Sequence, residues 1–210
     1  IKNMGLTYSV ITVVNRDDME DGGALHYKNC IDKVHDICPK VSLEFLCSDL
    51  SGNVNALEFL LQDSPLTVFA HNVETVRRLT PRVRDPRATF DQSLLILKKA
   101  KEFRPDIITK TSIMLGLGET EEDLLEAFEE LREANVDLLT LGQYLSPGSR
   151  YHPVVSFPSP ETFDSLAQIA KKMGFKAIAS GPMVRSSYRA ESLVAAAKGE
   201  TFDIELKVVA

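Results

Sequence analysis

Several polar segments of this 210-residue chain carry side chains that could bind a ligand, and the first is NRDDMEDGG at residues 15–23. Its carboxylates, including Asp21, could accept hydrogen bonds from an ammonium group, and Gly22 and Gly23 would let the backbone approach a ligand closely. The same composition is typical of a solvated turn. Both interpretations stay open, and only the position after an apolar run favours the functional one.

Two further segments place polar side chains beside apolar runs. In HNVET at 71–75, a lone histidine is more often a hydrogen-bonded structural residue than a ligand, whereas Asn72 and Glu74 could accept hydrogen bonds from ribose hydroxyls or an amine. Lys110 and Ser112 interrupt the apolar run IITKTSIMLG at 107–116. A charge there must be paired or must face a polar cavity, because burying it alone is costly.

Other patterns exclude common chemistries. GLGETEED from Gly116 lacks both the G-x-G-x-x-G spacing of dinucleotide sites and the Gly-Lys-Ser/Thr ending of a P-loop. No Ser/His/Asp arrangement or H-E-x-x-H motif supports hydrolysis, and the four histidines are scattered. The wide spacing of Cys30, Cys38 and Cys47 suits neither a disulfide framework nor a metal site, so we predict three reduced thiols.

Alternating strands and helices must position these side chains. Apolar, β-branched runs predict strands over 6–14, 41–47, 66–72, 107–116 and 136–145, and helices are predicted over 24–37, 56–61, 91–103, 121–134 and 160–173. Thr120, followed by three acids, predicts the start of the fourth helix. A polar, proline-containing connection is predicted over 80–91.

This alternation predicts an α/β fold of parallel strands joined by right-handed crossovers. Periodicity does not separate an open sheet from a barrel or part-barrel, but ligand loops follow the C-terminal ends of the strands in both. The polar clusters NRDDMEDGG, HNVET, GLGET and GQYLSPG all follow predicted strands. We therefore expect function at that rim.

The composition is that of one globular domain, with 44% hydrophobic residues and a formal net charge of −6. The charges are mixed along the chain, so nucleic acid and anionic membranes are not expected partners. No apolar run approaches the roughly 20 residues that cross a bilayer, and no signal-peptide pattern begins the chain. The expected location is the cytoplasm or an organelle matrix.

Longer strings in the sequence resemble one family. GPMVRSSYRA at 181–190 resembles lipoyl synthases most specifically, and TVFAHNVETVRRL, TSIMLGLGETEEDLLE and DLLTLGQYLSPGSRYHPV resemble the same family in the same order. ITVVNRDDMEDGGALHY also fits, although Asn15 stands where the family usually has aspartate. The resemblance covers residues 6–199.

The resemblance implies a radical S-adenosylmethionine (SAM) enzyme with a partial parallel (β/α)6 barrel over residues 1–200 and a tail over 201–210. Such an enzyme carries two [4Fe-4S] clusters, one that cleaves SAM to a 5′-deoxyadenosyl radical and an auxiliary cluster that supplies sulfur. Two sulfur atoms are inserted at C6 and C8 of an octanoyl-lysine. The implied partners are octanoylated lipoyl domains or the glycine-cleavage H protein, and an electron donor such as ferredoxin or flavodoxin.

By the same resemblance, Ser187 matches the family's non-cysteine ligand to the auxiliary cluster, with Arg185 beside it. A hydroxyl is a harder and weaker partner for iron than a thiolate, which suits iron that must be released. The segment Asp21, Gly22, Gly23 stands where radical SAM enzymes place a glycine-containing loop against the methionyl amino group. The further predicted contacts of the ribose and methionyl parts are Asn72, Glu74, Lys110 and Gln143.

One departure limits the resemblance. The family's C-x3-C-x2-C motif, its second cysteine triplet and its first strand would all lie upstream of Ile1, which would leave an open sheet edge. The abrupt start at Ile1 predicts part of a longer synthase, and we expect this chain alone to hold no stable cluster and to be inactive. The alternatives are a short form that borrows its clusters from another polypeptide, and a cluster-free module that only docks lipoyl domains.

Overall fold

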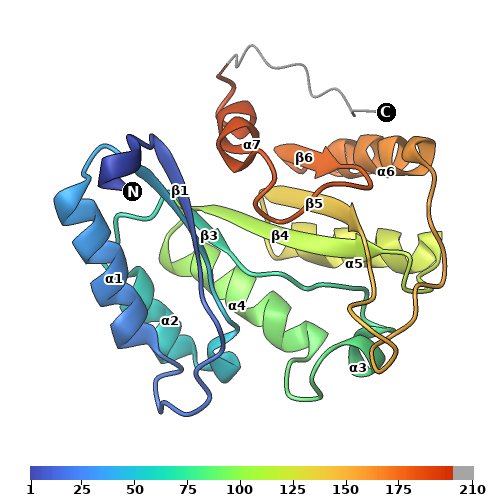
Figure 1. Cartoon of the computed structure of the whole chain (residues 1–210), viewed down its shortest axis with the longest axis horizontal. Helices are drawn as coiled ribbons and strands as arrows, with labels where there is room; N and C mark the ends of the chain where they lie inside the picture. Colours follow the sequence, from blue (N-terminus) through green and yellow to red (C-terminus); the bar gives the residue numbers. More distant parts are fainter. Residues whose placement is uncertain (201–210) are drawn as a thin grey trace.

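Six parallel strands form one curved sheet in the computed structural model, which describes residues 1–200 (Figure 1). The strands follow the chain in the order β1–β2–β3–β4–β5–β6, so every neighbour pair is joined by one crossover in the same sense. The strands are β1 (Tyr8–Thr12), β2 (Ser42–Leu46), β3 (Val68–Ala70), β4 (Ile108–Leu115), β5 (Leu138–Gln143) and β6 (Ala177–Ser180).

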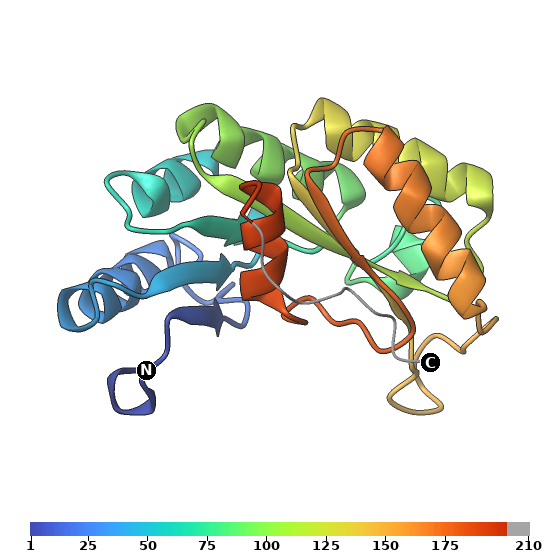
Figure 2. The ribbon, with the colours of Figure 1, turned by 90° about the horizontal axis from the view of Figure 1, so that it is seen from above.

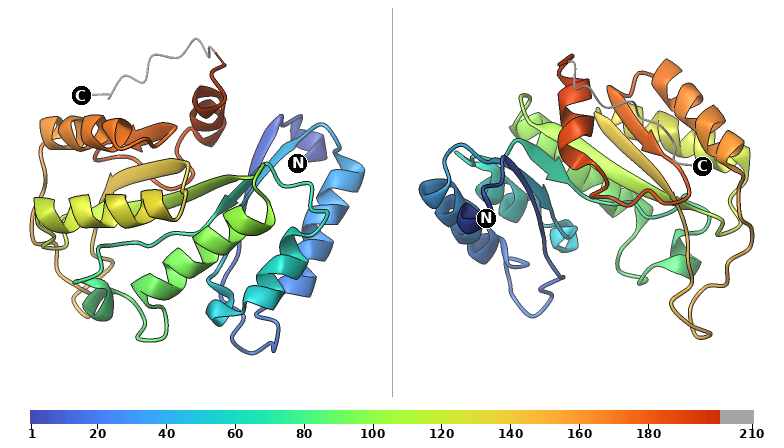
Figure 3. Two further views of the ribbon diagram at one scale, coloured as in Figure 1. Left: turned by 180° about the vertical axis from the view of Figure 1, so that it is seen from behind. Right: turned by 45° about the horizontal axis from the view of Figure 1, so that its top comes forward.

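The helices lie on two sides of this sheet. Figure 2 shows α1, α2, α4, α5 and α6 along the convex side and α7 on the concave side, and Figure 3 gives the view from behind. The helices are α1 (Ala24–Ile37), α2 (Val54–Leu61), α3 (Thr80–Val83), α4 (Phe90–Phe103), α5 (Glu121–Glu133), α6 (Pro160–Lys172) and α7 (Ala190–Ala197), with short 3-10 turns η1 (Lys2–Met4) and η2 (Leu50–Gly52).

A sequential strand order without a reversal is the winding of a barrel or part-barrel, since an open doubly wound sheet reverses its order at a switch point. The α/β part-barrel expected from the sequence is therefore confirmed. The absence of a first strand that belongs to the family stays a prediction. The predicted tail at 201–210 lies outside the described residues.

The predicted helices begin and end within two residues of the observed ones, and the helix over 24–37 has those same bounds. At α5 both bonds of a capping box are present: Asp123 N donates to Thr120 Oγ1 at 3.2 Å and Thr120 N donates to Asp123 Oδ2 at 2.8 Å. The acids after Thr120 were therefore a correct signal of a helix start.

Three elements escaped the sequence patterns. The connection over 80–91 contains α3, where Pro81 occupies the first turn, a position that needs no backbone N–H. β6 is only four residues long, too short for a periodic signal. α7 follows Arg189, which has a left-handed φ of 44° and no side-chain cap, so no cap marks its beginning.

The core is divided by the sheet. On the convex side, two clusters join the outward-facing strand residues to α1, α2 and α4 and to α5 and α6. On the concave side, a smaller cluster packs Val68, Ile108 and Leu138 against Leu193 and Val194 of α7. α7 therefore fills the N-terminal half of the hollow and leaves the C-terminal rim to polar side chains.

None of the helices in residues 1–200 is long and apolar enough to cross a membrane.

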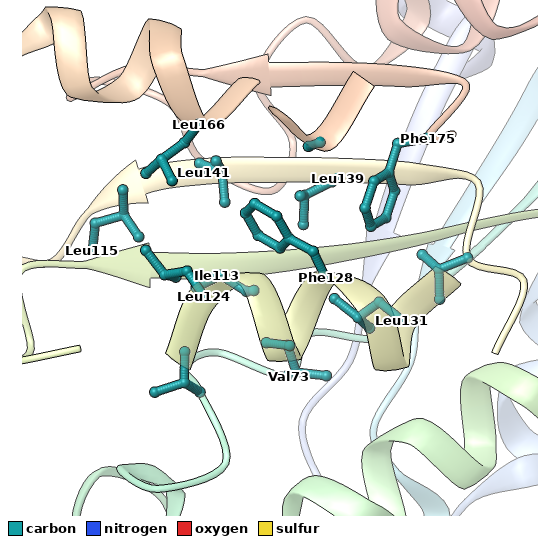
Figure 4. Close-up of a cluster of buried hydrophobic side chains, with 14 of the residues drawn as sticks. Val73, Ile113, Leu115, Leu124, Phe128, Leu131, Leu139, Leu141, Leu166 and Phe175 are labelled. Atoms are coloured by element: carbon teal, nitrogen blue, oxygen red, sulfur yellow. The ribbon is translucent and has the colours of Figure 1, made fainter. Parts of the chain in front are cut away.

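Phe128 tests the packing of the convex side. It is fully buried on α5 and meets the Phe175 ring edge-on at 6.0 Å between centroids (Figure 4). Phe128→Ala is expected to lower the free energy of unfolding by about 3–5 kcal/mol, because it leaves a cavity. Phe157→Ala, at a side chain that is 72% exposed, should cost less than about 1 kcal/mol. Urea denaturation of both variants measures the difference, and equal losses would contradict this core assignment.

Candidate functional site

A cavity of about 300 Å³ opens at the C-terminal ends of β3, β4 and β5. It brings together four residues that the sequence singled out, although they lie far apart along the chain. Its lining residues are Asn72, Glu74, Ser112, Met114, Gly142, Gln143, Leu145, Val184, Arg185 and Ser186. We call this space the rim cavity.

Glu74 is held in the rim cavity by an unusual backbone turn. Thr75 N donates to Val73 O at 2.8 Å across Glu74, whose φ is +67°, which forms a γ-turn. A positive φ at a residue other than glycine costs about 1–3 kcal/mol and persists only where the surroundings enforce it. Here β4 enforces it: Glu74 N donates to Ser112 O at 3.0 Å and Met114 N donates to Glu74 O at 2.8 Å.

The Glu74 carboxylate has few partners for its degree of burial. Asn72 Nδ2 donates to its Oε1 at 3.1 Å. Burial raises the pKa of Glu74, while the bond from Asn72 and the positive charge of Arg84 act in the opposite direction. A carboxylate in this position can accept further hydrogen bonds from a hydroxyl or an ammonium group.

The loop between β6 and α7 forms the other wall. A side chain at Gly142 would collide with the Val184 carbonyl oxygen, so glycine lets this loop cross closely over β5. Arg185 Nη1 donates to Val184 O at 2.8 Å and approaches Gln143 O at 3.5 Å. The Arg185 guanidinium is thereby held at the mouth of the cavity.

Gln143 lines the cavity, but its amide nitrogen is engaged elsewhere. Nε2 lies within hydrogen-bonding distance of three carbonyl oxygens, those of Leu115 at 3.2 Å, Tyr144 at 2.9 Å and Ser156 at 3.1 Å. These contacts tie the loop after β5 to the end of β4. The predicted contact between Gln143 and a ligand stays a prediction.

Lys110 lies deeper, inside the curve of the sheet, and does not line the rim cavity. Its Nζ donates to Glu44 Oε1 at 2.7 Å, and the Tyr8 hydroxyl donates to Glu44 Oε2 at 2.6 Å. Lys110 and Glu44 are each only 1% exposed. The sequence predicted that this lysine would need a partner. The signal for that partner was the single glutamate inside the apolar run VSLEFLC.

The loop Asp21–Gly22–Gly23 lines a different cavity, of about 330 Å³, with Asn53 and Phe59. Asp21 accepts hydrogen bonds from Gly23 N and Leu25 N, both at 2.9 Å, which begins α1 and lowers the pKa of Asp21. A Cβ at Gly23 would lie 2.8 Å from the Tyr27 ring. These residues thus have structural roles of their own, and their contact with a ligand stays a prediction.

Ser187 lies in the turn before α7 and is exposed. Its neighbours Arg185 and Ser186 line the rim cavity, whereas Ser187 is not among the lining residues. The structure therefore brings the RSSY string to the rim, and the role of Ser187 as a cluster ligand stays a prediction.

The family model described as the radical SAM superfamily matches residues 1–131. The chain belongs to the radical SAM superfamily. Its rim cavity lies at the C-terminal ends of the strands, where ligands of parallel α/β barrels bind.

Sequence comparison confirms the resemblance to lipoyl synthases. The chain is 51% identical over 191 residues to a lipoyl synthase of Marinobacter nauticus, which covers 91% of this chain and 55% of that protein. It is 50% identical to the Thermus thermophilus lipoyl synthase over 91% of this chain and 59% of that protein. It is 51% identical to the Plasmodium knowlesi apicoplast lipoyl synthase over 88% of this chain and 42% of that protein. The chain thus spans about half the length of the curated relatives it matches.

Solved structures support the fold alone. A methylornithine synthase superposes with a TM-score of 0.53 at 14% identity and covers 67% of this chain and 40% of its own. A 2,3-dimethylmalate lyase superposes with a TM-score of 0.52 at 14% identity, over 94% and 69%.

Membership of the radical SAM superfamily implies SAM and iron–sulfur clusters, and the two fit this chain differently. The rim cavity offers amide, carboxylate, hydroxyl and guanidinium groups to a polar ligand. Within residues 1–200, no group of three or more His, Cys, Asp or Glu side chains could hold a metal ion. Cys30 is exposed, Cys38 is half-buried and Cys47 is buried. Residues 1–200 therefore do not assemble a cluster site among themselves.

His71 belongs to a buried chain of hydrogen bonds beside the rim. Its Nδ1 lies 3.0 Å from Cys47 O and its Nε2 lies 2.9 Å from Ser93 Oγ, which also accepts from Arg84 Nη1 at 2.7 Å. Burial lowers the pKa of His71 to about 4, so its ring is neutral near pH 7. Because the carbonyl can only accept, Nδ1 carries the proton and Ser93 donates to Nε2. His71 is thus the structural histidine that base rates favoured, whereas Arg84 escaped the sequence reasoning because nothing in its neighbours marks it.

The ion pair inside the sheet predicts an asymmetric response to substitution. Lys110→Met should lower the free energy of unfolding by about 3–5 kcal/mol, because it leaves the Glu44 carboxylate buried without a counter-charge. Glu44→Gln combined with Lys110→Met should cost less than the sum of the single changes. Lys99→Met removes an ion pair with Glu102 at the helix surface and should cost less than about 1 kcal/mol. Urea denaturation gives all four values, and additivity of the pair would refute the coupling.

His71 also predicts a pH dependence of stability. Its pKa is about 4 in the fold and near its ordinary 6.5 in the unfolded chain, so the unfolded state binds more protons between these values. The stabilisation is complete above pH 6.5 and is lost as the pH falls toward 4, by up to about 3 kcal/mol. Unfolding free energies measured from pH 7 to 4 should fall less steeply for His71→Gln than for the wild type. Parallel curves would contradict this assignment.

Proposed function

We propose that this chain is part of a lipoyl synthase and that its rim cavity binds SAM. The observation that carries the proposal is the 48–51% identity to lipoyl synthases over about nine tenths of the chain. The gathering of Asn72, Glu74 and Arg185 in one cavity supports it, because these residues lie in strings that resemble the family and come from three separate segments.

The reaction proposed for the whole protein is the insertion of two sulfur atoms at C6 and C8 of a protein-bound octanoyl-lysine. SAM supplies the radical that removes hydrogen, and two [4Fe-4S] clusters take part. The proposed carriers are octanoylated lipoyl domains or the glycine-cleavage H protein, with ferredoxin or flavodoxin as the electron donor. The relatives named above come from bacteria and an apicoplast, which favours a cytoplasmic or organelle-matrix location.

Within this proposal, Glu74 and Asn72 accept hydrogen bonds from the ribose hydroxyls or the ammonium group of SAM. Arg185 holds a position at the mouth, and Ser187 supplies one oxygen ligand to the auxiliary cluster from its exposed turn. Cys30, Cys38 and Cys47 are not the cluster ligands of this proposal. The prediction that this chain alone lacks activity stays a prediction.

Lys110 contributes indirectly if its ion pair with Glu44 persists when SAM binds. The pair keeps β2 and β4 in register below the cavity, so that Ser112 and the Glu74 turn stay in place. The loop Asp21–Gly23 lies at the end of β1, where it would face the methionyl group from the opposite side of the rim.

Binding of S-adenosylhomocysteine, a stable analogue of SAM, tests this function in the 210-residue chain. The wild type is expected to bind it, and Glu74→Gln should weaken the affinity about tenfold, which corresponds to about 1.4 kcal/mol, because a charged acceptor becomes a neutral one. Isothermal titration calorimetry gives the dissociation constants. Glu129→Gln, at an exposed position on α5, is the matched control and should bind like the wild type. A wild-type chain that binds no analogue would overturn the proposal.

A further inference from the structure

Arg84 is a cation at the rim that no role above uses. It follows α3 directly and is half-buried. Its Nη1 donates to Ser93 Oγ, which is its one hydrogen bond from a side-chain nitrogen within residues 1–200. Among the same residues, no carboxylate oxygen lies within 4.0 Å of its guanidinium, whereas most other arginines of the chain have an ion pair at 2.6–2.9 Å.

The surroundings fix the position of this guanidinium. Ser93 is fully buried on α4, and its hydroxyl proton is directed to His71, which in turn donates to the carbonyl at the end of β2. The oxygen of Ser93 is therefore available only as an acceptor for Arg84. An arginine that is anchored through a buried serine and histidine has lost much of its side-chain freedom before any ligand arrives.

The remaining donors of Arg84 are accessible. No nitrogen of Arg84 is both buried and without a partner, so the nitrogens that lack a hydrogen bond reach solvent at the rim. Two carboxylates influence its charge, and both are engaged by other groups. Glu74 accepts from Asn72, and Asp49 accepts from Ser51 N and from Gln92 Nε2 at 2.8 Å.

We propose that Arg84 binds the carboxylate of an α-amino acid group whose ammonium group is received by Glu74. A cation and an anion that lie near each other without forming a contact can bracket a zwitterion, because each finds its opposite charge on the ligand. A guanidinium suits a carboxylate because it can donate two parallel hydrogen bonds. This inference rests on the proposed function and deepens it, since the methionyl end of SAM is such a group.

Two ligands that differ only at the amino acid end test the inference. S-adenosylhomocysteine carries the α-amino carboxylate, and 5′-methylthioadenosine carries the same nucleoside and thioether without it. Titration calorimetry of the 210-residue chain in iron-free buffer measures both. Arg84→Gln is expected to weaken binding of the first ligand at least about tenfold and to change binding of the second less than about twofold.

Controls separate charge, geometry and folding. Arg82→Gln removes an exposed arginine from α3, two residues away, and should leave both affinities unchanged. Arg84→Lys keeps the charge without the paired donors and should give an intermediate affinity for S-adenosylhomocysteine. Near-ultraviolet circular dichroism verifies that the variants fold, and Arg84→Lys serves as the test if Arg84→Gln does not.

Each outcome decides one question. If Arg84→Gln weakens both ligands equally or neither, the carboxylate contact is wrong while the proposed SAM site stands. A wild-type chain that binds the two ligands equally well overturns the contact in the same way. If the wild type binds neither ligand, the proposed function fails and the inference fails with it.

Discussion

The ion pair between Lys110 and Glu44 is the contact on which the hollow of the sheet depends. Three layers follow one another along the strands: apolar residues against α7, then this pair, then the polar lining of the rim cavity. Residues 108, 110, 112 and 114 of β4 alternate inward through these layers, since every second residue of a strand faces the same side. The pair thus forms a polar floor between a dry half and an open half.

This layering explains why the site uses backbone geometry so extensively. Glu74 reaches the cavity through a γ-turn that β4 holds in place, and the loop after β6 crosses β5 where Gly142 has no side chain. The amide of Gln143 then joins the ends of β4 and β5. Side chains from distant segments meet because each loop is tied to a neighbouring strand at a defined point.

The sequence predicted most of the fold because its signals are local. The capping box at Thr120 and the apolar periodicity of α1 and α4 act within a few residues, and both were read correctly. β6 and α7 lacked such signals, since one is very short and the other begins without a side-chain cap. The general place of the site also followed from the sequence, because parallel strands bring their C-terminal ends to one rim.

The finer arrangement of the site depends on contacts between residues far apart in the chain. Nothing near Arg84 in the sequence indicates that its partner is Ser93 and that His71 orients both. Likewise, the separate cavity beside Asp21 depends on how Asn53 and Phe59 approach it. Such tertiary geometry leaves no periodic trace, so the sequence could nominate residues but could not group them.

The turn at residue 74 carries a consequence for how such a protein can change. Its φ of +67° suits glycine, so the backbone alone would be more comfortable with the one residue that has no side chain to offer. A variant selected only for thermal resistance would therefore drift toward glycine at this position and lose the carboxylate. The glutamate marks a place where robustness and ligand recognition oppose each other within a single residue.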